Sequence, residues 1–217
     1  MTSRNWYRKT TWSKADQEDF EKHFSRARGV TKPQALTIQA HHLIHDIGTR
    51  DAINAGIGLI DRMLKDYSAD FENARAYDFL GDANERLGNF DSALVAYSLS
   101  LDAQRKCPGI TGQVHLSFGD LVARLKIKER YEEALNALKE FGSNDQLTQK
   151  TRFMHESILA RILYDLGEAE KAKLHALNAL KSAYVADQFF TKEKGIGKLS
   201  NEDYRKLEKE IRQIANS

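Results

Sequence analysis

Two histidines and two aspartates are the side chains whose types and spacing best suit chemistry. His41 and His45 stand four residues apart, as do Asp78 and Asp82, so each pair falls on one face of a predicted helix. Two imidazoles facing two carboxylates could ligate a divalent metal ion. They could equally form a hydrogen-bonded patch in which an aspartate tunes the charge of each histidine. Two histidines at this spacing are a weak signal for a metal, so we predict neither a metal nor a cofactor.

No spacing of residues in the chain matches a catalytic motif, and we therefore expect a protein without enzymatic activity. Residues 195–200 contain two glycines, a lysine and a serine. They lack the spacing of a phosphate-binding loop and follow no predicted strand. Adjacent carboxylates such as Glu132 and Glu133 belong to predicted outer helix faces, where solvated charge is the ordinary explanation.

Small residues recur at matched points, and their period predicts the elements that position the histidines and aspartates. One series consists of Ala40, Gly81, Gly119 and Ala160, and a second consists of Ala52, Ala93, Ala134 and Ala172. The second series follows the first by twelve residues, except in the third repeat, where the offset is fifteen. Such a double series is typical of stacked helix pairs, in which small residues let neighbouring helices approach closely.

Four helix pairs are expected, within residues 33–66, 70–105, 109–141 and 145–186. Glycine after a helix supplies the left-handed residue that reverses the chain, so we place turns at Gly48, Gly88 and Gly167. The turn of the third pair is expected at residues 126–129. The three additional residues of the third repeat predict a lengthened helix or a longer turn at that point.

One further helix is expected on each side of the repeats. The first covers about residues 14–28, with Ser13 and Asp16 as a capping box, and the aromatics Trp6 and Trp12 are expected to cover the open end of the stack. The last covers residues 201–216, and it carries a second capping box and an apolar stripe that we expect to cover the last repeat: Ser200 with Asp203, then Tyr204, Leu207, Ile211 and Ile214.

The second repeat resembles the tetratricopeptide repeat family. The resemblance rests, in order, on Tyr77, Leu80, Gly81, Gly88, Phe90, Ala93 and Tyr97. It extends less fully over residues 33–183. The N-terminal part is also similar to that of a set of bacterial tetratricopeptide proteins through Trp6-Tyr7-Arg8, Trp12, Phe20, Phe24 and Ile38-Gln39-Ala40.

This resemblance implies an all-α fold, a right-handed α-solenoid of about four helix pairs in a single domain over residues 1–217. Within it, residues 1–32 form an N-terminal aromatic segment and helix, residues 33–186 form the repeats, and residues 187–217 form a linker and a capping helix.

The resemblance also implies a concave groove lined by the first helix of each pair. The groove positions of the family fall here on Gln34, Thr37, His41, His45, Arg75, Asp78, Asp82, Glu85, Arg86, Gln113, Asp120, Arg124, Met154, Ser157, Arg161, Tyr164 and Asp165. A lining of mixed charge suits a peptide with both charges, or a folded partner. Some family members bind a C-terminal carboxylate with lysine, asparagine and arginine. The matching positions here are Thr37, His41, Asp78 and Asp82, which argues against that role.

We therefore expect a non-enzymatic scaffold that binds a protein or peptide. The net charge of +2, from 33 basic and 31 acidic residues, argues against a dedicated nucleic-acid surface. The lone cysteine, Cys107, and the lack of a stretch apolar enough for a signal peptide or membrane span favour the cytoplasm and no membrane partner.

Three alternatives stay open. The chain could neutralise or regulate one cognate protein, as antitoxin-like immunity proteins do. It could bind nucleic acid through Arg4, Arg8 and Lys9, which are interleaved with Trp6 and Tyr7, together with residues 192–198. The C-terminal segment, with Phe189, Phe190 and the last helix, could cover this chain or a second copy and so form a homodimer.

Overall fold

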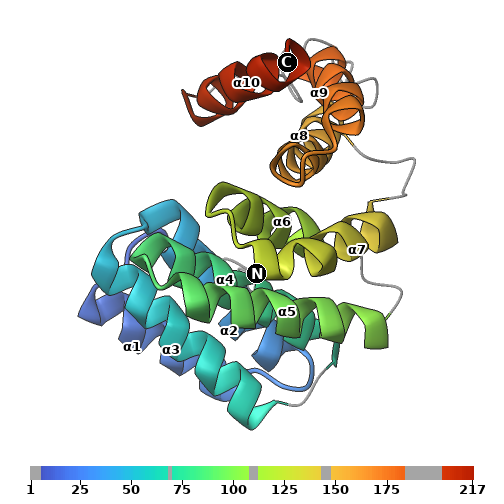
Figure 1. Cartoon of the computed structure of the whole chain (residues 1–217). Helices are drawn as coiled ribbons and strands as arrows, with labels where there is room; N and C mark the ends of the chain where they lie inside the picture. The colour runs from blue at the N-terminus through green and yellow to red at the C-terminus, as the bar shows by residue number, and fades with distance from the viewer. Residues whose placement is uncertain (1–5, 68–69, 108–111, 143–147, 184–201) are drawn as a thin grey trace. The chain divides into compact units, whose positions relative to one another are not determined.

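All regular structure in the described part of the chain is helical (Figure 1). The computed structural model describes residues 6–67, 70–107, 112–142, 148–183 and 202–217. Over these residues the elements are α1 (Lys14–Arg26), α2 (Thr31–His41), η1 (His42–Ile47), α3 (Arg50–Asp66), α4 (Asp70–Leu87), α5 (Phe90–Lys106), α6 (Val114–Arg124), η2 (Lys128–Arg130), α7 (Tyr131–Phe141), α8 (Gln149–Asp165), α9 (Ala169–Ala183) and α10 (Glu202–Ala215). The helices pack in sequential antiparallel pairs, and the prediction of an all-α fold is confirmed.

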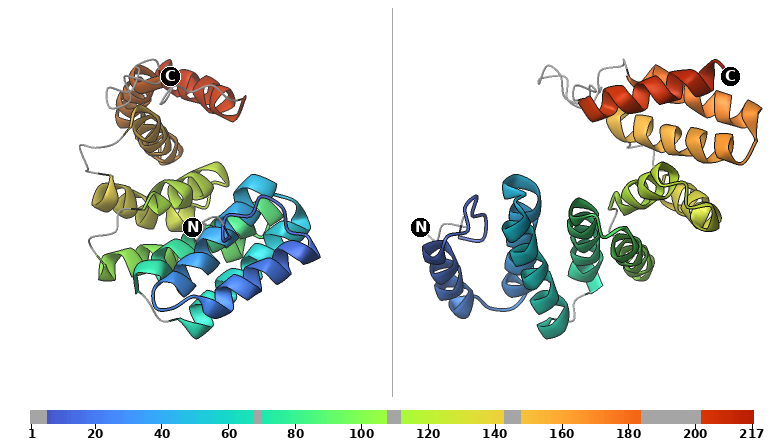
Figure 2. Two further views of the ribbon diagram at one scale, coloured as in Figure 1. Left: turned by 180° about the vertical axis from the view of Figure 1, so that it is seen from behind. Right: turned by 60° about the vertical axis from the view of Figure 1, so that its left-hand side comes forward.

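The chain divides into two compact units, Met1–Val114 and His115–Ser217. In the first unit α2 packs on α3, and α4 packs on α5 and α3. In the second unit α8 pairs with α9, and α10 lies against both of them (Figure 2). Each unit has its own buried apolar cluster.

The residues of both small-residue series are buried where helices meet. All eight residues are buried: Ala40, Gly81, Gly119 and Ala160 of the first series, and Ala52, Ala93, Ala134 and Ala172 of the second. At Gly81 of α4 the neighbouring helix approaches closely, because an added Cβ atom would lie 2.3 Å from Cδ1 of Tyr97 in α5. Since the Tyr97 side chain is itself fully buried, the interpretation of Gly81 as the close contact within this pair is confirmed.

The predicted turns are confirmed, with one variation. Gly48, Gly88 and Gly167 have positive φ angles of 66°, 81° and 79°. The third turn has no glycine, and Lys126 takes its place with a φ of 54°. The 3-10 turn Lys128–Arg130 follows, so the three additional residues of the third repeat lengthen the turn and not the helix.

A π-helix replaces the last turns of the first helix of the first pair. The α-helical pattern of α2 ends at His41, and residues His42–Ile47 continue as a π-helix that ends at Gly48. The prediction of a regular α-helix up to Gly48 is therefore wrong for residues 42–47. A π-helical turn has a hydrogen bond that spans one more residue than in an α-helix, which shifts the side chains that follow to new directions.

The first helix begins where it was predicted and has the predicted capping box. The Ser13 side chain and the Asp16 backbone form one half of a capping box, and the Asp16 carboxylate accepts from Ser13 N–H at 2.9 Å to form the other. The helix ends at Arg26, two residues before the predicted end. Trp6 and Trp12 pack on Phe20, and their ring centroids lie 5.3 and 5.6 Å from that of Phe20.

The last helix also lies where it was predicted. The stripe of Tyr204, Leu207, Ile211 and Ile214 packs with buried residues of α8 and α9. Within the described residues, no helix is both long enough and apolar enough to cross a membrane. Arg4, Phe189, Phe190, residues 192–198 and the predicted cap Ser200 lie outside the described residues, as does the side chain of Asp203.

Candidate functional site

The predicted groove residues divide between the two units. His41, His45, Arg75, Asp78, Asp82, Glu85, Arg86 and Gln113 belong to the first, and Asp120, Arg124, Arg161, Tyr164 and Asp165 to the second. Gln113 precedes α6 and is exposed. Arg75 lies 3.5 Å from Glu72, and Arg124 lies 3.5 Å from Asp120. The remaining residues gather in two polar clusters, one in each unit.

Asp82 is the centre of the cluster in the first unit. Its Oδ1 accepts a hydrogen bond of 2.8 Å from the Tyr97 hydroxyl, and its Oδ2 lies 3.1 Å from His45 Nε2, at ion-pair distance. The same hydroxyl lies 3.0 Å from Glu85 Oε2, and Arg86 Nη2 lies 3.3 Å from His45 Nδ1. We call His45, Asp82, Glu85, Arg86 and Tyr97 the Asp82 network.

The two ring nitrogens of His45 have different surroundings. A guanidinium group has only donors, so the Arg86 contact is a hydrogen bond only if His45 Nδ1 accepts. His45 Nε2 lies 3.1 Å from Asp82 Oδ2 and is buried without a hydrogen-bond partner.

Helix packing brings these groups together. The Tyr97 ring packs against Gly81 of α4, which has no side chain, and its hydroxyl reaches Asp82 and Glu85. That buried position raises the pKa of Tyr97 through desolvation first, and then through the two carboxylates. Tyr97 therefore stays protonated and acts as a hydrogen-bond donor.

His41 and His45 share a face, as their spacing predicted. Their ring centroids are 4.6 Å apart, and Phe79 of α4 lies 4.9 Å from the ring of His41. His42 is directed instead to Asp46, at 2.5 Å. The pKa of His41 is lowered by burial, and further by the neighbouring His45 and His42.

The geometry favours a hydrogen-bonded patch over a metal site. Within the described residues, no group of three or more His, Cys, Asp or Glu side chains is arranged to hold a metal ion. His45 and Asp82 do meet, but Asp78 is not joined to them by a hydrogen bond. Its Oδ1 is buried and has no hydrogen-bond partner. Burial and the nearby Asp82 raise the pKa of Asp78 to about 8, so this carboxyl group holds a proton at neutral pH.

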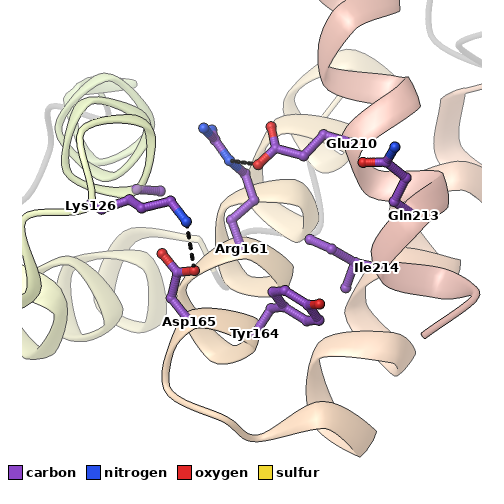
Figure 3. A pocket seen from close by; sticks show the side chains of 8 residues that line it. Lys126, Arg161, Tyr164, Asp165, Glu210, Gln213 and Ile214 are labelled. Atoms are coloured by element: carbon purple, nitrogen blue, oxygen red, sulfur yellow. Dashed lines mark hydrogen bonds and ion pairs between the residues drawn. The ribbon is translucent and has the colours of Figure 1, made fainter.

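The second unit contains a pocket of about 230 Å³ between α8, α10 and the turn after α6 (Figure 3). It is lined by Ala123, Lys126, Arg161, Tyr164, Asp165, Glu210, Gln213 and Ile214. Three of these, Arg161, Tyr164 and Asp165, are among the predicted groove residues.

Arg161 is the most buried charge of the pocket. Its side chain is only 10% exposed. Nη1 donates to Asp120 Oδ1 at 3.0 Å, and Nε donates to Glu210 Oε1 at 3.1 Å. One guanidinium thus joins α6, α8 and α10, because its planar fork can serve two carboxylates at once.

A second charged pair, Lys126 and Asp165, lies on the side of the pocket away from α10, as Figure 3 shows. Lys126 Nζ donates to Asp165 Oδ1 at 3.1 Å, and the Tyr131 hydroxyl donates to Oδ2 at 2.8 Å. Burial alone would raise the pKa of Asp165, but the hydrogen bonds from Tyr131 and Lys126 outweigh it, and the pKa is lowered. Asp165 is therefore a fixed negative charge.

The pocket offers a mixed binding surface. The Lys126 side chain is 68% exposed and Tyr164 is 46% exposed, so an ammonium group and an aromatic ring are open to a ligand. Ala123 and Ile214 add apolar surface. Donors, acceptors, a ring and apolar contact together can bind a peptide side chain and its adjoining backbone.

Two of the implied groove positions are not exposed. Thr37 and Ser157 are fully buried, and the Thr37 hydroxyl donates to the Pro33 carbonyl at 2.9 Å. The expectation that these two side chains face an open groove is wrong, because packed neighbours cover both of them. Three residues of the pocket were not predicted from the sequence: Lys126, Glu210 and Gln213. They lie in a turn and in the last helix, outside the predicted groove positions.

The N-terminal basic and aromatic residues are largely used within the first unit. Lys9 Nζ donates to Asp19 at 2.6 Å and lies 3.7 Å from Asp16, and Tyr7 is buried. Arg8 is exposed. These contacts favour packing over nucleic-acid binding as the role of this segment.

No family model, curated protein or solved structure matches this chain.

Replacing Arg161 by alanine is expected to lower the free energy of unfolding by about 1–3 kcal/mol, since Asp120 and Glu210 would be left facing each other. Chemical denaturation measures the change. The control is Lys171→Ala, which removes an exposed ion pair with Glu168 and is expected to cost less than about 0.5 kcal/mol. Equal losses in the two variants would show that the buried guanidinium contributes no more than a surface charge.

Proposed function

We propose that this chain is a non-enzymatic scaffold of tetratricopeptide-like helix pairs, wound as a right-handed α-solenoid, that binds a peptide or protein partner on its first helices. The proposal rests mainly on the pocket beside Arg161. There, three residues at groove positions meet the last helix and leave an ammonium group and an aromatic ring open.

Contacts at the repeat distance support the fold part of the proposal. His45 contacts Arg86, and Asp120 contacts Arg161, and each pair is separated by 41 residues. Each contact therefore joins the same position in two successive first helices, which is expected if the helix pairs stack in register.

A site-specific crosslink tests the proposal. A photo-crosslinking phenylalanine analogue at position 164, introduced in cells that make the protein, is expected to capture one partner. The same analogue at the exposed Lys139 of α7 serves as the control position. Capture by both positions alike would contradict binding at the pocket.

Variants of the pocket rim then establish specificity. Tyr164→Ala and Lys126→Gln are expected to weaken capture by about tenfold, because aromatic and charged anchors dominate most interfaces. Both side chains are well exposed, so an unchanged melting temperature serves as the folding control. Asp82 is unsuitable for this test, because it accepts a hydrogen bond from the buried hydroxyl of Tyr97 and its replacement would also disturb the packing.

A further inference from the structure

The outward face of α9 carries two large apolar side chains in contact with solvent. Leu174 is 58% exposed and Leu177 is 51% exposed. The opposite face is the one that packs in the second unit, through Ala172, Ala176, Ala179 and Ala183. α9 therefore has two apolar faces, and the core of its own unit uses only one of them.

The exposed face has the spacing of a helix-pairing seam. Glu170, Leu174, Leu177 and Lys181 follow one another at intervals of four, three and four residues, and all four are exposed. This is the spacing at which side chains line up along one edge of a helix and meet a second helix in a coiled coil. We call these four residues the α9 seam.

The charges of the α9 seam are complementary to a second copy of the same seam. When two α9 helices pack antiparallel about the point midway between Leu174 and Leu177, Leu174 of one chain faces Leu177 of the other. In the same register Glu170 faces Lys181 at both ends. Such matching of a surface to itself is what a two-fold symmetric interface requires, and opposite charges at the ends favour the antiparallel orientation.

We propose that the α9 seam is a dimer interface that pairs with the α9 seam of a second copy of this chain in antiparallel orientation. This surface differs from residues 187–217, where the sequence left a homodimer open. The seam is short, so the dimer is weak and forms at high protein concentration, as small interfaces generally do.

A second exposed apolar pair in the chain lacks this property. Val95 and Leu99 of α5 are 59% and 41% exposed. When α5 is paired with itself about these two residues, Asp102 faces Ser92, so no opposite charges meet. The α5 face therefore provides a matched control for hydrophobic association without charge complementarity.

Charge exchange on the full-length chain tests the proposal. The molar mass, measured by sedimentation over a concentration series, is expected to double for the wild-type chain. Glu170→Lys places two lysines opposite each other at both ends, and Lys181→Glu places two glutamates there, so each variant is expected to dimerise at least about tenfold more weakly. The variant with both exchanges restores opposite charges and is expected to dimerise like the wild type.

Mixing the two single variants gives the sharpest result. The Glu170→Lys chain presents two lysines and the Lys181→Glu chain presents two glutamates, so a mixture is expected to form a heterodimer as readily as the wild type dimerises, although each chain alone dimerises at least about tenfold more weakly. Leu174→Glu with Leu177→Glu is expected to abolish the dimer, whereas Val95→Glu with Leu99→Glu leaves it intact. A wild-type chain that stays monomeric at all concentrations, or single variants that dimerise as well as the wild type, would overturn the proposal.

Discussion

Replacing Gly81 by alanine is expected to lower the free energy of unfolding by about 2–3 kcal/mol, although alanine is the better helix former. The new methyl carbon would lie 2.3 Å from both Cδ1 and Cε1 of Tyr97 and 2.9 Å from Cζ. The Tyr97 ring is fully buried and its hydroxyl is held by Asp82. The ring cannot move aside without opening the contact between α4 and α5.

Gly58 provides a matched control for this change. It lies inside α3, and an added Cβ atom would meet nothing within 4 Å. Gly58→Ala is therefore expected to raise the free energy of unfolding by about 0.5–1 kcal/mol, through helix propensity alone. Urea denaturation of both variants measures the difference.

A double-mutant cycle assigns the effect to Tyr97. In a Tyr97→Leu background, the cost of Gly81→Ala is expected to fall by at least about 1 kcal/mol, because the smaller side chain leaves room for the methyl group. If the cost of Gly81→Ala is the same in both backgrounds, the ring is not the obstacle.

Asp78→Asn is expected to stabilise the protein at alkaline pH. Burial and Asp82 raise the pKa of Asp78 from 3.8 to about 8. The folded chain therefore holds a proton that the unfolded chain releases at lower pH. The contribution of this group to stability is fully present below pH 3.8 and is lost as the pH rises to about 8.

The difference between variant and wild type isolates Asp78 and its coupling to Asp82, because the carboxylates away from this pair are the same in both proteins. Asparagine cannot ionise, so the free energy of unfolding of Asp78→Asn is expected to exceed that of the wild type by several kcal/mol at pH 9, since each unit of pKa shift corresponds to about 1.4 kcal/mol. The excess should disappear as the pH falls toward 4. Asp61→Asn, at an exposed position of α3, controls for the change in net charge. A difference that does not depend on pH would contradict the assignment.

The elements of the fold were largely predictable from local signals. Ser13 and Asp16 set the start of α1, and the glycines at 48, 88 and 167 set three of the turns. The π-helix after His41 was not predictable, because its residues carry an ordinary helical pattern. The π-helix differs from an α-helix in its backbone hydrogen bonds, and the periodicity of side chains along the sequence does not reveal this difference.

The sites were predictable only in part. The four-residue spacing of His41 and His45 indicated that they share a face, and the structure brings their rings together. The same reasoning treated Asp78 and Asp82 alike. In the structure Asp82 has a hydroxyl and an imidazole as neighbours, while the Oδ1 atom of Asp78 is buried without a hydrogen-bond partner. Spacing along one helix does not reveal what covers each side chain.

Local signals were sufficient to predict which residues become helices and which small residues lie at their contacts, because capping, glycine turns and periodic packing act over short distances along the chain. Which charges meet depends instead on how the helices pack in three dimensions. The pocket beside Arg161 is formed by the turn after α6, by α8 and by the last helix, α10. Residues that far apart in sequence come together through the packing of whole helices, and no local pattern encodes their distances.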